Sequence, residues 1–233
     1  DTLGSDQDAF IGRFEVNGER QMPNPLYHTD RTSDKGFTTT GVIEYAEGAI
    51  RQSIAVVALE DGETSLVIDR TTSDVDLSLN EGLGIYVMND FVNDNRVSIS
   101  FDGGRRTVRG VGGKAQVIET GSTWLKLAGC LGVETSGLPL HYEDTAERNS
   151  PEKWRNLLQD RVFLRPDASG NTARDYAYVV RQGRAGTHRV GQGVERVDTS
   201  VDGIRAYRFK SRTADTIAVA NFSQSTQNLD VAG

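Results

Sequence analysis

The chain has 233 residues, with 33 acidic and 26 basic side chains and a formal net charge of −7 at neutral pH. This length can bury a substantial core, and the acidic balance excludes the basic stripe that a nucleic-acid partner needs. The one cysteine, Cys130, excludes an internal disulfide, and its apolar sequence neighbours predict a buried, inert thiol.

The first part of the chain changes from mixed polarity to a strand pattern. Residues 1–36 are mixed, and Pro23 and Pro25 predict a turn there. From residue 37 to residue 45 the pattern becomes that of a strand, and residues 50–59 are apolar enough for a central strand. No run approaches the length of a membrane span, so no membrane partner is expected.

Hairpins follow in the middle of the chain, where apolar and polar residues alternate with the period of two that is typical of a strand. Residues 60–63 predict a turn into a strand at 64–69, and residues 102–104 predict a turn between strands at 97–101 and 105–111. Val75, Leu77 and Leu79 also alternate with polar residues. Further strands are expected at 174–180, 203–209, 216–222 and 228–231.

One short helix is expected at residues 150–158. Ser150 is a good N-cap, and Pro151 suits the first helical position. Trp154, Leu157 and Leu158 would share one face. The elements together predict an all-β fold, a large antiparallel β-sandwich with one short helix. We expect one domain over residues 1–233, and because the chain begins with Asp, we expect it to be excised or processed from a longer chain.

The densest polar cluster, residues 89–96, is rich in Asn and Asp. Such residues suit tight turns, but they also bind sugar hydroxyls or a neighbouring domain, and they can supply oxygen ligands to calcium. All three interpretations stay open, with Asp90, Asn93 and Asp94 as the possible calcium ligands. The candidate sugar contacts in this cluster are Asn89, Asp90, Asn93, Asn95 and Arg96.

Two histidines lie among other polar side chains and are candidates for proton transfer. His28 lies beside Asp30 and Arg31, which are candidate substrate contacts, and His141 precedes Tyr142. A His, Tyr and carboxylate set could abstract a proton next to a sugar carboxylate or act at a glycosidic bond. The histidines are far apart in sequence and lack the His-Glu-x-x-His spacing, so no metal site is expected on them.

The two tryptophans, Trp124 and Trp154, are either core residues or platforms for a sugar ring. Trp124 begins an apolar strand, which favours the core, but an exposed indole would stack well on a pyranose. We therefore keep Trp124 as a candidate substrate contact.

Several segments resemble the C-terminal β-sandwich domains of polysaccharide lyases and related carbohydrate-active enzymes, the heparinase II/III-like and chondroitin or hyaluronan lyase groups. The resemblance spans roughly residues 40–225 as a pattern, and it implies a supersandwich like that of galactose mutarotase. It rests on an apolar strand and the turn after it at 53–62, an apolar strand ending in Asp-Arg at 64–70, and the segments 89–91, 95–96, 124–133 and 173–180.

The resemblance implies an accessory domain that packs on a helical α/α-toroid and lines the cleft for a polysaccharide or oligosaccharide. It also implies an extracellular or periplasmic location. In those families most catalytic residues come from the toroid, so none is transferred to this chain. Two alternatives stay open: a self-contained sugar enzyme, such as a mutarotase-like epimerase or a small lyase, and a non-catalytic module for carbohydrate binding or oligomerisation.

Overall fold

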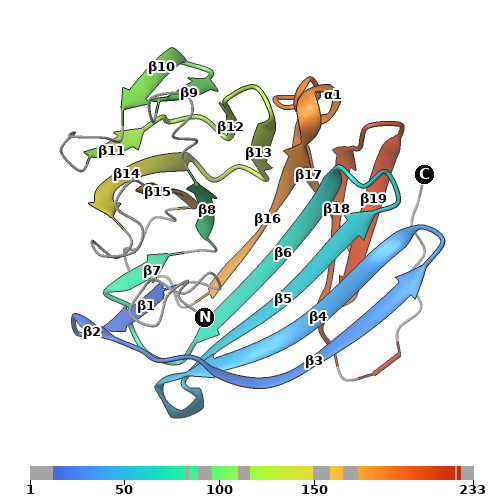
Figure 1. Ribbon diagram of the computed structural model, residues 1–233. Coiled ribbons are helices and arrows are strands. Elements are labelled where there is room, and N and C mark those ends of the chain that lie inside the picture. Colours follow the sequence, from blue (N-terminus) through green and yellow to red (C-terminus); the bar gives the residue numbers. More distant parts are fainter. Residues whose placement is uncertain are drawn as a thin grey trace.

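The computed structural model describes residues 13–81, 84–88, 96–109, 116–148, 158–164, 173–223 and 225–226. These residues form antiparallel sheets, one of them nine-stranded, and the prediction of an all-β antiparallel fold is confirmed (Figure 1). Within the described ranges, no helix is both long enough and apolar enough to cross a bilayer.

The nine-stranded sheet forms the centre of the structure, in the order β10-β9-β12-β13-β16-β6-β5-β4-β3. Four of its neighbouring strands, β3 to β6, are each ten residues long and follow one another as hairpins. The strands are β3 (Asn24–Ser33), β4 (Gly36–Tyr45), β5 (Ile50–Leu59), β6 (Thr64–Ser73), β9 (Arg96–Phe101), β10 (Gly104–Arg109), β12 (Trp124–Leu127), β13 (Leu131–Thr135) and β16 (Ala173–Gln182).

Three smaller sheets pack on this large sheet. The β2-β1-β7 sheet contains β1 (Arg13–Val16), β2 (Glu19–Arg20) and β7 (Leu79–Glu81). The β11-β14-β15-β8 sheet contains β8 (Gly84–Met88), β11 (Gln116–Glu119), β14 (Leu140–Arg148) and β15 (Leu158–Leu164). The β17-β18-β19 sheet contains β17 (Val194–Val197), β18 (Ile204–Lys210) and β19 (Asp215–Asn221).

Both faces of the large sheet are buried at its central strands, which explains why these strands carry apolar residues in succession. On β6, Val67 belongs to the core shared with the β11-β14-β15-β8 sheet, whereas Leu66 and Ile68 belong to the core shared with the β17-β18-β19 sheet. Because successive strand residues point to opposite faces, these two small sheets cover opposite faces of the large one. A third core, around Phe14 and Tyr45, joins the β2-β1-β7 sheet to β4 and β5.

Most predicted strands and hairpins are confirmed, but the region of Pro25 differs. Residues 24–33 form the long edge strand β3 instead of the expected turn, and the pairing register with β4 shifts between Pro25 and Tyr27. An edge strand tolerates proline at such an irregularity because the missing N–H is not needed for a second neighbour. The alternating segment around Val75 is also mostly outside a strand, since β7 begins at Leu79.

The predicted helix is corrected in part. Residues 149–157, including Trp154, lie outside the described residues, but Leu158 begins strand β15 instead of ending a helix, so that part of the prediction is wrong. The described helical elements are α1 (Gly183–Thr187) and a 3-10 turn at Ala46–Gly48. The predicted strand at 228–231 is also outside the described residues.

Cys130 is exposed, which corrects the prediction of a buried thiol. It lies in the turn between β12 and β13, where Ala128 and Gly129 have φ angles of 51° and 71°. The turn projects from the sheet, while Leu127, at the end of β12, points into the core. Apolar neighbours therefore predicted the burial of the strand ends but not the exposure of the turn.

Candidate functional site

A groove runs between β19 and the part of the large sheet formed by β3, β4 and β5. It consists of two cavities of about 400 and 530 Å³ that share Thr38, Val57 and Val219 in their lining. The groove exists because the β17-β18-β19 sheet is narrower than the sheet it covers. Its core contacts reach β16, β6 and β5, whereas β3 is exposed along its whole length (Figure 1).

The floor of the groove is set by the strand register. Thr29 pairs with Thr40, which pairs with Ala55 on the next strand. One pleat along, Arg31 pairs with Thr38 and Thr38 pairs with Val57. Residues in register on neighbouring strands share a face of the sheet, so hydroxyl groups and one guanidinium lie beside a short apolar strip.

The wall of the groove comes from β19 and the turn that follows it. Val219, Ala220 and Asn221 line the groove from β19, whose other edge pairs with β18. The Asn221 side chain builds the turn: its Oδ1 accepts a hydrogen bond from the N–H of Ser223 at 2.9 Å, and its Nδ2 donates to the carbonyl of Ser225 at 2.9 Å. Ser223, Ser225 and Thr226 then line the same cavity.

Asp61 fixes the end of the groove near the β5–β6 turn. Its carboxylate accepts hydrogen bonds from the N–H groups of Glu63 at 2.9 Å and Thr64 at 2.8 Å, and from that of Arg212 at 3.3 Å. Burial acts to raise the pKa of Asp61, but these hydrogen bonds outweigh burial and hold the pKa below its ordinary value. Because Arg212 lies between β18 and β19, Asp61 links the two sides of the groove.

Two ion pairs, one of them fully buried, fasten the β17-β18-β19 sheet and so fix the position of the groove wall. The Arg181 guanidinium lies 3.0 Å from a Glu134 oxygen and donates to the carbonyl of Lys210 at 2.7 Å, at one end of β18. At the other end, a nitrogen of Arg205 lies 3.0 Å from an Asp175 oxygen. Both pairs hold β18 against the large sheet, and β19 is in turn paired with β18.

The structure places Arg31 in the groove but separates it from the other two predicted residues of β3. His28 and Asp30 point to the opposite face, because they are an odd number of residues from Arg31. The Nε2 atom of His28 lies 3.9 Å from an Asp30 oxygen, and both side chains are exposed. The sequence motif around His28 therefore divides between the two faces of one strand.

His141 and Tyr142 lie on β14, in a different sheet from His28. Both are buried, with exposed fractions of 7% and 0%, and Tyr142 belongs to the core between β14 and the large sheet. The structure does not bring these two residues together with His28. The third histidine, His188, is exposed just after α1.

Most of the predicted Asn and Asp cluster lies outside the described residues. This applies to Asn89, Asp90, Asn93, Asp94 and Asn95, and therefore to the calcium hypothesis. Arg96 is the first residue of β9. Across the ranges that the structure does describe, no group of three or more His, Cys, Asp or Glu side chains could hold a metal ion.

Trp124 is half-buried at the start of β12, away from the groove. Its Nε1 donates a hydrogen bond of 2.6 Å to Asp102, and the Nζ atom of Lys126 lies 5.8 Å from the centre of its ring. The indole is thus held by its own neighbours at the β9–β10 end of the large sheet.

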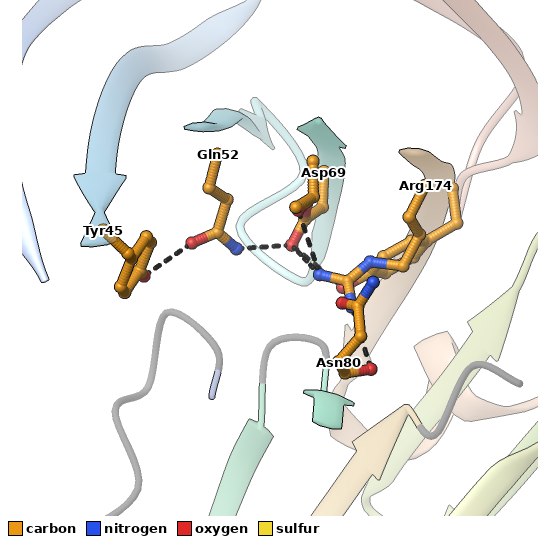
Figure 2. Close-up of polar contacts among 7 residues, drawn as sticks. Tyr45, Gln52, Asp69, Asn80 and Arg174 are labelled. Carbon is orange, nitrogen blue, oxygen red and sulfur yellow. Dashed lines mark hydrogen bonds and ion pairs between the residues drawn. The ribbon is translucent and has the colours of Figure 1, made fainter. Parts of the chain in front are cut away.

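A buried polar network centred on Asp69 was not predicted from the sequence (Figure 2). One Asp69 oxygen accepts hydrogen bonds from Gln52 at 2.7 Å and Tyr176 at 2.9 Å, and lies 3.5 Å from Arg174. Arg174 also donates to both the carbonyl and the side-chain oxygen of Asn80, the middle residue of β7. The network joins the large sheet to the β2-β1-β7 sheet, and its members are too deeply buried to meet a ligand.

Tyrosines around this network are held in the neutral form. Burial, and secondarily the negative charge of Asp69, raises the pKa of Tyr45 and of Tyr178 well above the ordinary value. The Tyr45 hydroxyl therefore remains a donor, and it donates to Gln52 at 2.8 Å. The apolar run Leu66-Val67-Ile68 directly before Asp69 was the one sequence signal that a carboxylate would lie at this depth.

Comparisons with known proteins relate the fold to carbohydrate-active enzymes. No protein-family model matches the chain, and no curated protein matches its sequence. Among solved structures, a Paenibacillus xanthan lyase matches 97% of this chain at 9% identity with a TM-score of 0.56. The GH36 α-galactosidase AgaA from Geobacillus stearothermophilus matches 79% at 12% identity with a TM-score of 0.53.

A heparan sulfate lyase, HepC from Pedobacter heparinus, also matches 92% of the chain at 11% identity with a TM-score of 0.49. The chain spans only 21% of the xanthan lyase and 32% of AgaA. The matches to the xanthan lyase and AgaA confirm, at the level of the fold, the expected likeness to a β-domain of larger carbohydrate-active enzymes.

Proposed function

We propose that this chain is an accessory β-domain of a polysaccharide-degrading enzyme, a lyase or a glycoside hydrolase. It packs on a helical catalytic domain of the toroid type and lines one side of the sugar cleft. The observation that carries the proposal is the fold match to a xanthan lyase and an α-galactosidase, each over less than a third of its own length.

The positions of the candidate proton-transfer residues support a non-catalytic role for the chain alone. A general acid or base must come within hydrogen-bond reach of the atom it serves, directly or through one water. His28 lies on the exposed edge strand of the large sheet, whereas His141 is buried in another sheet. These candidates form no common site, so proton transfer is assigned to the partner domain.

The groove beside β19 is the surface that we assign to the glycan. Hydroxyl and amide groups from both of its sides can donate and accept hydrogen bonds with sugar hydroxyls. An enzyme that degrades polysaccharides meets them outside the cytoplasm, so an extracellular or periplasmic location is part of this proposal.

The proposal is tested by comparing the 233-residue chain with the complete product of its gene. We expect the flanking sequence to encode a region of roughly 300–400 residues with helical periodicity, which is long enough for a toroid of helices. Both proteins are incubated with a panel of polysaccharides, and unsaturated uronate absorbance and new reducing ends are measured. We expect activity from the complete product and none from the chain alone.

Two results would contradict the proposal. Turnover by the isolated chain would favour the self-contained enzyme, and His28→Ala and His141→Ala variants would then identify its acid or base. A gene without any helical flanking region would favour a free-standing binding or oligomerisation module.

A further inference from the structure

We propose that the groove beside β19 binds an acidic polysaccharide and that Arg31 recognises a carboxylate or sulfate group of the sugar. The inference rests on the proposed function, which makes the ligand a sugar, and deepens it by assigning a negative charge to that sugar. It is carried by the charge and the polarity of the groove lining.

Arg31 supplies the charge. It is exposed, and it is the only charged side chain among the described residues that line the 530 Å³ cavity. Within the described part of the chain it has no carboxylate close enough for an ion pair, whereas Lys35 in the neighbouring cavity lies 3.8 Å from Glu60. A guanidinium without a partner presents paired N–H donors that match a carboxylate or sulfate.

The two ends of the groove differ in charge, which gives the glycan an orientation. Glu60 and Asp61 line the 400 Å³ cavity with one cation, Lys35, so the cavity is net negative and would repel an anionic sugar. Leu59 lines the same cavity, shares a face of β5 with Val57, and offers an apolar surface to the apolar face of a pyranose. The charged sugar therefore lies beside Arg31, and the uncharged part of the glycan extends toward Leu59.

The polarity of the floor favours a sugar over an extended peptide. A peptide could add to the open edge of β19 as a fourth strand and would then lie over β3 and β4. Strands that pack sheet on sheet need an apolar face to bury, but this face carries Thr29, Arg31, Thr38 and Thr40. A strand without an acidic residue opposite Arg31 would cover the guanidinium and leave it unpaired, whereas an anionic sugar pairs with it.

Binding is tested by affinity electrophoresis of the 233-residue chain in gels that contain dextran, dextran sulfate or polygalacturonate. We expect retardation by at least one of the two acidic polymers and little by neutral dextran. Arg31→Ala should weaken that retardation by about tenfold, because it removes a charge-assisted pair of hydrogen bonds. Arg31→Lys keeps the charge but not the fork, and its retardation should fall between those of Arg31→Ala and the native chain.

Arg106→Ala is the matched control, because Arg106 is also exposed but lies on β10, at the opposite edge of the large sheet. It should leave the retardation unchanged. A second pair tests the position of the glycan without removing charge. Thr38 lines both cavities and shares a face of the sheet with Arg31, whereas Val117 lies on β11, so Thr38→Trp should block binding and Val117→Trp should not.

Equal losses in Arg31→Ala and Arg106→Ala would show non-specific charge attraction and would overturn the inference. The same holds if Thr38→Trp binds like the native chain, if neutral dextran retards as strongly as the acidic polymers, or if no polymer retards the chain at all. These results leave the comparison of the isolated chain with the complete gene product unaffected, so the two proposals fail separately. Polygalacturonate and dextran sulfate also separate carboxylate from sulfate as the recognised group.

Discussion

At the scale of single residues, burial of charge decides what each polar side chain can do. Asp69 is 0% exposed and is surrounded by the donors of Gln52, Thr71, Arg174 and Tyr176. The Arg174 guanidinium also lies 5.0 Å from the Tyr176 ring centre, so its face is covered as well. A carboxylate so fully enclosed by donors has a structural role. Loss of its charge should weaken the contact between the large sheet and the β2-β1-β7 sheet.

Asp69→Asn should lower the free energy of unfolding by about 3–5 kcal/mol, because it leaves the buried Arg174 without a counter-charge and turns an amide donor toward other donors. The measurement is urea denaturation followed by circular dichroism. Asp76→Asn is the control at an exposed position of the chain and should change the value by less than about 0.5 kcal/mol. Similar small effects for both variants would contradict the structural role of Asp69.

Asp61 should make stability depend on acid. Its pKa in the folded chain is lowered, so it contributes stability above the pKa of the unfolded chain, and this contribution is lost as the pH falls through the folded value. Asp61→Asn removes the titrating group. The difference in unfolding free energy between native chain and variant should therefore be largest near about pH 6 and should narrow toward about pH 3. A difference that stays constant over this range would contradict the explanation.

At the scale of elements, the turn between β3 and β4 is held unusually close to its neighbour. Gly36 has a φ of 128°, and a Cβ atom there would lie 2.0 Å from the carbonyl oxygen of Ala58 on β5. Only glycine permits this approach, which keeps β3 and β4 alongside β5 and completes the floor of the groove.

Gly36→Ala should therefore destabilise the chain more than Gly104→Ala. Gly104, the first residue of β10, has a φ of 131°, but nothing lies within 4 Å of a Cβ atom at that position. The control has nearly the same φ and lacks the clash, so the difference between the variants should be about 1–3 kcal/mol in thermal or urea unfolding. Equal effects would mean that the turn moves freely away from β5.

At the scale of the whole molecule, the sequence predicted the hairpins but not the order of the strands. Local alternation was enough for β5 and β6, because they follow each other and pair. The pairing of β6 with β16 joins Asp69 to Tyr176, and no local pattern encodes a contact between residues so far apart. The buried network of Asp69 depends on that contact, so it could not be predicted either.

The candidate site was predictable only in part, because the two sides of the groove come from segments that are far apart in the sequence. The polar neighbours of Arg31 identify it as a candidate contact, but the prolines predict a turn where β3 begins and so obscure the strand period of two. In a strand, that period places Arg31 and His28 on opposite faces. The wall of the groove comes from β19, almost two hundred residues later, and neither segment alone indicates that the two would meet.

The exposed strand β3 has one more consequence, for solubility. As the last strand of the large sheet in the described chain, it offers ten residues of backbone that another copy could extend into a continuous ribbon. Pro25 and the two adjacent charged residues Asp30 and Arg31 are of the kind that discourages such edge-to-edge pairing. The same guanidinium that we assign to glycan recognition thus also helps to keep neighbouring molecules apart in concentrated solution.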